Sequence, residues 1–445
     1  MTRAVVLGGG FAGVLAAHVL AKHADEVVVI ERDHYPPGPV PRRGLPQSHH
    51  NHVLVTSGAR ALDALLPGVV DELLARGAHR HGLPGDALIL TAEGWFRRLD
   101  TDAYLLSCTR ALLDEVVRRR VAVPVREGTR ALGLIGDADA VRGVTVRRGD
   151  GAVESVEADF VLDASGRRSK APRWLAELGA GPIEEEIAAS GLAYATRIYR
   201  PPARLAAIPA IMIHPKGQPA CGGTLFPIED GRWIVTLTGT RGGEPPTDER
   251  AFMDFARSLR DPLIADLMAA ATPLGGVRPY RDTANRRRFF ERARLPAGFA
   301  VIGDAAVAVN PMHSHGMSVA AMTALKLDHE LTERGATTGG LQVALAAEAD
   351  DSWRMAVERT DQQVRLSPFE REIRTRLSRA LLSSRDLAAE FFARHTLIPA
   401  VPAGAWLKQE APPLTTEQAV AQHPRLSAWW SAQARTSAQA RPGEP

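Results

Sequence analysis

A glycine-rich turn between a strand and a helix places the tightest constraint on the fold of this chain. Gly8, Gly10 and Gly13 follow the apolar run 4–7 and open the segment 14–22, which has helical spacing. Gly8 permits a tight turn, Gly10 lets the backbone approach a pyrophosphate, and Gly13 lets the helix pack on the strand. The N-terminus of such a helix offers unpaired N–H groups and a positive dipole end to phosphates.

A carboxylate at the end of the next strand completes this pattern. The apolar run 27–30 predicts a second buried parallel strand, and Glu31 follows it directly. A carboxylate in that position can accept hydrogen bonds from ribose hydroxyls. Together these features predict a dinucleotide-binding unit, for which NAD and FAD both remain open.

Two later glycine turns favour FAD over NAD. The first spans 163–169, and the second begins at Gly303 and continues through 310–317 into a helix. Asp304, at a strand end, is placed to accept a hydrogen bond from a ribityl hydroxyl. The N-terminus of the helix near Gly316 would favour negative charge on a reduced flavin ring. Either turn alone is also typical of an ordinary loop.

Composition and charge exclude several classes of protein. The 445 residues carry 54 basic and 51 acidic side chains, and the longest arginine runs, 118–120 and 286–288, are too short for a nucleic-acid groove. Two cysteines, Cys108 and Cys221, cannot build a disulfide framework or a zinc ribbon. Residues 1–21 resemble a signal peptide superficially, but their glycines would weaken a signal helix. We therefore expect a cytoplasmic protein with no nucleic-acid partner and no membrane span.

The pattern along the chain predicts an α/β fold. Helical spacing occurs at about 57–76, 104–120 and 317–332, and β-prone stretches with a hairpin signal at Asp230-Gly231 lie between about 185 and 285. We interpret these stretches as an antiparallel sheet inserted into a Rossmann-type domain, and the end of the chain as a loosely attached tail. The predicted units are a FAD-binding domain (1–85, 101–182 and 286–335), a substrate-binding β-sheet domain (86–100 and 183–285) and a C-terminal helical region and tail (336–445).

The three glycine-containing segments, taken together, resemble the class A flavoprotein monooxygenases. The resemblance covers roughly 1–55, 100–175 and 290–335. Within that class, the loop 43–52 (RGLPQSHHNH) is similar to a loop of bacterial flavin epoxidases of polyether biosynthesis. Asn310-Pro311 followed by 316–321 (GMSVAA) points to the same group, which is more distantly similar to squalene epoxidases.

The resemblance implies a set of cofactor-binding residues in the three turns and the segments between them. Arg32 would lie beside the adenosine, and Arg43 and Arg110 near the pyrophosphate or the ribityl chain. Asp304 would contact the pyrophosphate or the ribityl hydroxyls. The full set is Gly8, Gly10, Phe11, Ala12, Gly13, Glu31, Arg32, Arg43, Arg110, Asp163, Gly303, Asp304, Gly316 and Met317.

Candidates that would border the isoalloxazine lie on two loops. Where the family often has an aromatic residue and Gln before the loop glycine, this chain has His313-Ser314-His315, which leaves the substrate open. The loop histidines could instead hold a metal, but the carboxylates usual in such sites are missing and the spacing suits no common ligand pattern. We expect no metal and interpret them as hydrogen-bonded loop residues, one of which could gate proton delivery to the flavin. The candidates are Pro46, Gln47, His50, His52, Pro311, His313 and His315.

The resemblance also implies a reaction. Reduced FAD and O₂ would form a C4a-hydroperoxide, whose distal oxygen passes to a small hydrophobic organic substrate. We expect epoxidation of an alkene in a polyketide or terpenoid-type secondary metabolite, because this step needs no protein nucleophile and the sequence shows no catalytic constellation. The alternatives are hydroxylation of an aromatic substrate, a flavin dehydrogenase or reductase such as a saturase, and a non-enzymatic FAD- or NAD-binding module. NAD(P)H would bind transiently as electron donor, or a separate reductase would supply electrons.

Overall fold

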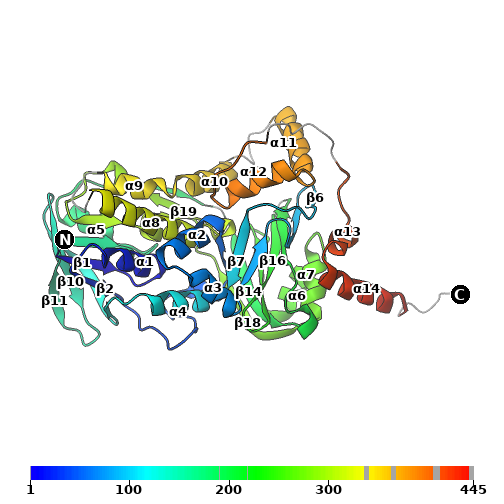
Figure 1. Cartoon of the computed structure of the whole chain (residues 1–445), viewed down its shortest axis with the longest axis horizontal. Helices are drawn as coiled ribbons and strands as arrows, with labels where there is room; N and C mark the ends of the chain where they lie inside the picture. The colour runs from blue at the N-terminus through cyan, green and yellow to red at the C-terminus, as the bar shows by residue number, and fades with distance from the viewer. Residues whose placement is uncertain are drawn as a thin grey trace.

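The computed structural model describes residues 2–189, 191–217, 219–334, 340–361, 367–403 and 411–439. Within these residues, a parallel sheet near the N-terminus and a larger, mainly antiparallel sheet follow one another along the long axis of the molecule (Figure 1). Helices pack on both sheets, so the α/β fold expected from the sequence is confirmed.

The five-stranded sheet is parallel throughout, with the strand order β20-β12-β1-β2-β8. At its centre β1 pairs with β2 on one side and with β12 on the other, and β1 and β12 are buried almost throughout. The turns that follow β1, β12 and β20 therefore meet at one edge of the sheet, where the strands have their carboxyl ends. The strands are β1 (Arg3–Leu7), β2 (Glu26–Ile30), β8 (Val125–Arg126), β12 (Phe160–Asp163) and β20 (Phe299–Val301).

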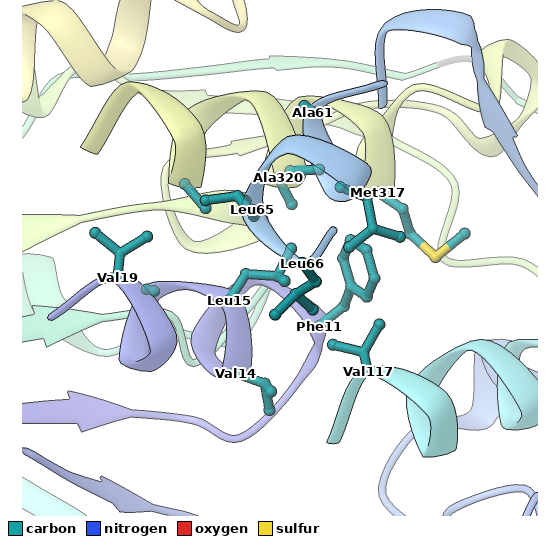
Figure 2. Packing of buried hydrophobic residues seen from close by; sticks show 14 of the residues in the cluster. Phe11, Val14, Leu15, Val19, Ala61, Leu65, Leu66, Val117, Met317 and Ala320 are labelled. Carbon is teal, nitrogen blue, oxygen red and sulfur yellow. The ribbon is translucent and has the colours of Figure 1, made fainter. Parts of the chain in front are cut away.

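Helices cover one face of this sheet, and a small antiparallel sheet packs on the other. Figure 2 shows the helical side, where Phe11 and Leu15 belong to the same buried cluster as Leu65, Met317 and Ala320. The other face packs on valines of β10 and β11. The elements are α1 (Phe11–Leu20), α2 (Thr56–Leu65), α3 (Val69–Ala75), α4 (Arg110–Arg120) and α8 (Gly316–Arg334) on the first side, and β9 (Arg130–Gly136), β10 (Val141–Arg147), β11 (Val153–Glu157) and α5 (Ala171–Glu177) on the second.

The larger sheet has seven strands in the order β18-β14-β17-β16-β15-β5-β6. Asp230 and Gly231 join β16 to β17 with φ angles of 60° and 62°, which confirms the predicted hairpin. Segments 86–100 and 183–285 both supply strands to this sheet, and α6 (Glu249–Ser258) and α7 (Leu263–Ala269) cover one face of it. The strands are β5 (Ala87–Thr91), β6 (Gly94–Trp95), β14 (Ala193–Arg200), β15 (Ala210–Lys216), β16 (Cys221–Ile228), β17 (Arg232–Gly239) and β18 (Thr272–Tyr280).

Two three-stranded sheets lie between the larger units. One has the order β3-β7-β4 and the other β13-β19-β21. Their strands are β3 (His52–Val55), β4 (His79–Gly82), β7 (Tyr104–Cys108), β13 (Glu185–Ala188), β19 (Asn285–Arg288) and β21 (Val307–Ala308).

The last two described helices pack on the larger sheet, in a part of the chain that was expected to be a loosely attached tail. Ala419 and Leu426 are fully buried against the core of that sheet, and Trp429 is 4% exposed, so residues 416–429 are docked. Among the described residues, no helix combines the length and the apolar character that crossing a bilayer requires. The helices are α9 (Leu341–Ala347), α10 (Asp350–Asp361), α11 (Pro368–Leu381), α12 (Arg385–His395), α13 (Thr416–Ala421) and α14 (Pro424–Gln439).

Two predicted helices divide into separate elements. The stretch 57–76 forms α2 and α3, because Gly68 adopts a left-handed φ of +79° between them. The stretch 104–120 forms β7 and then α4, and Thr109 caps the helix by accepting a hydrogen bond from the Leu112 amide. Cys108 therefore ends a strand, not a helix.

Candidate functional site

The first glycine turn is closely packed at two positions and open at a third. Gly8 has a φ of +95°, and a Cβ atom there would lie 2.7 Å from the Ala164 carbonyl oxygen. A Cβ atom at Gly13 would lie 1.9 Å from the Gly8 carbonyl oxygen, because α1 packs directly on the turn. At Gly10, the N-cap of α1, a Cβ atom would meet nothing within 4 Å. The turn thus leaves room for a ligand at the N-terminus of α1.

Glu31 is buried and holds the turn in shape. Its Oε2 accepts a hydrogen bond from the Gly9 amide at 2.6 Å, and its Oε1 accepts one from the Asp33 amide at 2.9 Å. The loop also brings Arg42 to this turn, while its neighbour Arg43, expected near the pyrophosphate or the ribityl chain, is exposed. Arg42 donates to the Gly9 carbonyl at 2.9 Å and lies 3.4 Å from Glu31 Oε2.

One cavity of about 320 Å³ touches all three glycine turns and the larger sheet. It does not reach Gly13, Arg43, Asp163, His50 or His315, and the side chains of Pro46 and His313 lie outside the described residues. The expected residues that line it are Gly8, Gly10, Phe11, Ala12, Glu31, Arg32, Gln47, His52, Arg110, Gly303, Asp304, Pro311, Gly316 and Met317.

Asp304, Arg167 and Arg110 are three of the charged residues that line this cavity. Asp304 follows Gly303, whose φ is +62°, and its Oδ2 lies 3.6 Å from Nε of Arg167. Arg167 also donates to the carbonyls of Ala284 at 2.8 Å and Val309 at 3.1 Å. Burial inside the protein raises the pKa of Asp304 although its side chain stays 39% exposed where it lines the cavity, and Arg167 and Arg110 oppose that rise. The group offers a carboxylate acceptor and two guanidinium groups to a ligand, although Arg110 also pairs with Asp114 at 2.7 Å.

Asp163 is hydrogen-bonded within the second turn and does not line the cavity, so its expected contact with the cofactor remains a prediction. It is fully buried, and its Oδ1 accepts a hydrogen bond from the Ser165 amide at 2.8 Å while its Oδ2 accepts one from Ser169 Oγ. Burial raises the pKa of this carboxyl, and the hydrogen bonds from the two serines oppose the rise. The turn residues Ser165, Gly166 and Arg167 line the cavity instead.

The segment before α8 borders the cavity, but His315 points away from it. The Asn310 side chain caps the short helix η5 (Pro311–His313) by accepting a hydrogen bond from the Met312 amide at 3.0 Å. His315 is fully buried, with Nδ1 3.0 Å from Ser352 Oγ and Nε2 2.9 Å from the His395 carbonyl oxygen. These partners lie on α10 and α12, so His315 fastens C-terminal helices to the start of α8 rather than bordering a ligand.

His50 adjoins an aromatic pair at the sheet end of the cavity, and His52 Nδ1 lies 2.8 Å from the His50 carbonyl oxygen. Tyr194 of β14 and Tyr280 of β18 are direct cross-strand partners, their rings lie 5.2 Å apart, and both line the cavity. The His50 ring stands edge-on to Tyr194 at 4.7 Å and its Nδ1 lies 2.9 Å from Thr196 Oγ1. Burial lowers the pKa of His50 to about 3 and that of His52 to about 4, so both imidazoles are neutral at pH 7. Burial also raises the pKa of both tyrosines.

Several cavity residues were not expected from the sequence. Tyr194 and Tyr280 come together only through strand pairing, and Arg42 differs from Arg43 only in the direction of its side chain. Asn51 and Trp174 also line the cavity, and the buried Asn51 Oδ1 and Trp174 Nε1 have no hydrogen-bond partner among the described residues. Only Asn51 could have been found from the sequence, because it lies within the loop 43–52 that carries part of the family resemblance.

The cavity fits FAD on three observations. The open space at Gly10 lies where a helix N-terminus favours a pyrophosphate. Asn51 Oδ1 and Trp174 Nε1 are buried polar atoms that a ligand in the cavity could satisfy. Asp304, Arg110 and Arg167 add an acceptor and cations to the lining of the same cavity. Within the described part of the chain, no group of His, Cys, Asp and Glu side chains is arranged to hold a metal ion.

Three turns gathered at one edge of a parallel sheet, with an inserted antiparallel sheet over the same cavity, define the fold of the class A flavin monooxygenases. The chain belongs to the family described as FAD binding domain, whose model matches residues 1–347.

The chain is similar to known proteins over most of its length. Protein Rv3254 of Mycobacterium tuberculosis is 30% identical over 369 residues, which cover 78% of this chain and 75% of the relative. Kynurenine 3-monooxygenase of Salinispora tropica is 28% identical over 355 residues, which cover 74% of this chain and 72% of that enzyme. The solved structure of the flavin-dependent brominase Bmp2 matches with a TM-score of 0.65 at 16% identity, over 89% of this chain and 94% of the brominase. At that identity the likeness shows a shared fold alone.

Proposed function

We propose that the chain binds FAD along the cavity and inserts one oxygen atom from O₂ into a small apolar substrate held against the larger sheet. The observation that carries this proposal is that a single cavity is lined by all three glycine turns and by Tyr194 and Tyr280. A redox cofactor and a substrate could therefore share one cavity.

The proposed cofactor contacts follow the cavity from the glycine turn to α8. The pyrophosphate would lie beside Gly10, where the amides at the start of α1 are unpaired. Glu31 and Arg32 would face the adenosine, and Asp304 the ribityl chain. The flavin ring would lie near Gly316, where the start of α8 favours negative charge.

Bound FAD, once reduced, supplies an activated oxygen atom derived from O₂. The part of the chain is to hold the ring, to exclude water and to present the substrate. Tyr194 and Tyr280 would form the wall that keeps water from the reacting atoms. His50 and His52 would remain neutral and so would not supply a proton there at pH 7.

We propose epoxidation of an alkene as the reaction, on a polyketide or terpenoid-type secondary metabolite. Transfer of an electrophilic oxygen atom to a double bond needs no protein base, and the histidine and tyrosine side chains at the sheet end are all neutral at pH 7. Hydroxylation of an aromatic substrate is the second candidate, and one observation favours it: a substrate ring could stack on the Tyr194–Tyr280 pair. NAD(P)H binding transiently at the flavin, or a separate reductase, would supply the electrons.

Oxygen labelling tests the proposal directly. The FAD-reconstituted protein, supplied with NADH, NADPH or a free flavin reductase, would be incubated under ¹⁸O₂ with a panel of apolar polyenes and of phenols. An epoxide carrying one ¹⁸O atom is the expected product, and a labelled phenol product would favour hydroxylation. A saturated or desaturated product without label would identify a reductase or dehydrogenase. Failure to retain FAD would refute the proposal as a whole.

A further inference from the structure

Helix α11 exposes an apolar stripe to solvent and packs on the protein at its C-terminal end, through Leu381. Phe369, Ile373 and Leu377 are spaced four residues apart and so share one face, and they are 73%, 44% and 43% exposed. Thr375 and Ser378, on the opposite face, are only partly exposed. A surface helix of a soluble protein normally has the reverse orientation.

This stripe lies at the edge of the molecule. In Figure 1, α11 projects beyond α12 at the top of the view. No residue of α11 is buried, whereas Leu382, which follows it, belongs to the core beneath the larger sheet. The helix is therefore anchored at its C-terminal end while its apolar face stays uncovered by the described chain.

Two arginines border the stripe, and one of them is paired within the helix. At 100° per residue, Arg374 and Arg376 fall on either side of the apolar face. Arg376 pairs with Glu372 at 2.8 Å, and Glu370 is occupied by the capping box with Ser367. Arg371, Arg374 and Arg379 form no ion pair with any described residue. The 14 residues of α11 carry four arginines and two glutamates, so the apolar stripe belongs to a helix of net positive charge, with the unpaired Arg374 beside it.

We propose that α11 docks the protein onto an anionic lipid surface, with the apolar stripe at the headgroup boundary and the arginines on the lipid phosphates. An apolar stripe flanked by basic residues is the pattern of an interfacial helix, and each basic residue near an anionic surface strengthens binding. A second copy of the chain is a poorer occupant, because two such faces would bring their unpaired arginines together. The inference stands independently of the reaction proposed above.

Vesicle co-sedimentation tests the proposal with the full chain. Wild-type protein is expected to bind vesicles of phosphatidylcholine and phosphatidylglycerol, to bind phosphatidylcholine vesicles weakly, and to dissociate as salt is raised. Replacing all three stripe residues (Phe369→Ser, Ile373→Ser and Leu377→Ser) should lower the partition coefficient at least about tenfold. Val343→Ser, at a side chain 55% exposed on α9, is the matched control and should leave binding unchanged.

Two single variants test the proposal in case the triple variant fails to fold. Arg374→Gln and Arg379→Gln keep the apolar stripe and should each weaken vesicle binding about fivefold. The proposal is overturned if wild-type protein does not bind anionic vesicles, or if the stripe variant binds as well as wild type. It is also overturned if sedimentation velocity shows a wild-type dimer that the stripe variant loses, since the face would then belong to a second copy.

Discussion

Gly10→Ala should separate cofactor binding from folding of the glycine turn, because Gly10 and Gly13 are glycines for different reasons. Gly10 has a φ of −77°, which any residue adopts, and a Cβ atom there would meet nothing within 4 Å. A Cβ atom at Gly13 would lie 1.9 Å from the Gly8 carbonyl oxygen. A methyl group at Gly10 therefore enters the cavity, whereas one at Gly13 pushes α1 off the turn.

The expected magnitudes differ accordingly. Gly10→Ala should change the free energy of unfolding of FAD-free protein by less than about 1 kcal/mol, the scale of N-cap and Gly-to-Ala effects. The methyl group would keep the pyrophosphate from at least one backbone N–H, and a charge-assisted hydrogen bond contributes about 1.5–3 kcal/mol. The Kd for FAD should therefore rise about ten- to a hundredfold. Gly13→Ala should instead lower the free energy of unfolding by about 3 kcal/mol.

Two measurements on the same variants separate the effect on FAD binding from the effect on folding. Urea denaturation of FAD-free protein gives the free energy of unfolding, and quenching of flavin fluorescence gives the Kd for FAD. Gly181→Ala is the matched control, because Gly181 also faces open space but lies outside the cavity lining, so neither quantity should change. If Gly10→Ala binds FAD as tightly as wild type, the pyrophosphate does not lie at the start of α1. If it is destabilised as strongly as Gly13→Ala, the space at Gly10 is not open, and the prediction fails at its first step.

Three further outcomes follow from the structure. Asp304→Ala should raise the Kd for FAD about tenfold while leaving the urea midpoint of FAD-free protein unchanged, and a normal Kd would remove Asp304 from the cofactor site. His81 is buried with its pKa lowered to about 3, so the unfolded chain gains a proton below about pH 6.5 while the folded chain does not. Stability should thus fall as pH drops from about 6.5 toward 3, and His81→Gln should reduce the slope of unfolding free energy against pH in urea titrations by up to about 1.4 kcal/mol per pH unit; an unchanged slope would contradict this. His315→Leu should cost about 2–4 kcal/mol and expose α10–α12 to limited proteolysis, because it leaves Ser352 Oγ and the His395 carbonyl without this partner; unaltered proteolysis would refute the fastening role.

The parts of the fold that local chemistry determines were predictable from the sequence. The first glycine turn and the Asp230-Gly231 hairpin each depend on a few adjacent residues whose backbone geometry only certain side chains permit. The stretch 104–108 was misassigned because a short apolar run is compatible with a strand or a helix. Thr109 was the available signal, since a residue that caps α4 marks the end of the element before it.

The remaining parts of the site depend on contacts between distant segments, which a sequence pattern does not report. Arg42 and Arg43 are adjacent and chemically identical, and only the path of the loop decides which one reaches Glu31. His315 was expected near a flavin because of its place in the loop, but α10 and α12 supply both ring nitrogens with partners. The domain division and the roles of the individual cofactor residues remain predictions.

The two ends of the cavity therefore differ in how they are encoded. At the proposed cofactor end, Gly10 and Asp304 belong to short turns whose conformation is determined by adjacent residues. At the sheet end, Tyr194 and Tyr280 face each other only because β14 and β18 pair in one particular register. Substitutions at these two tyrosines can change the wall of the cavity without touching the turns. The substrate preference of this fold can thus change while its cofactor site stays the same, and so the substrate is harder to predict from the sequence than FAD.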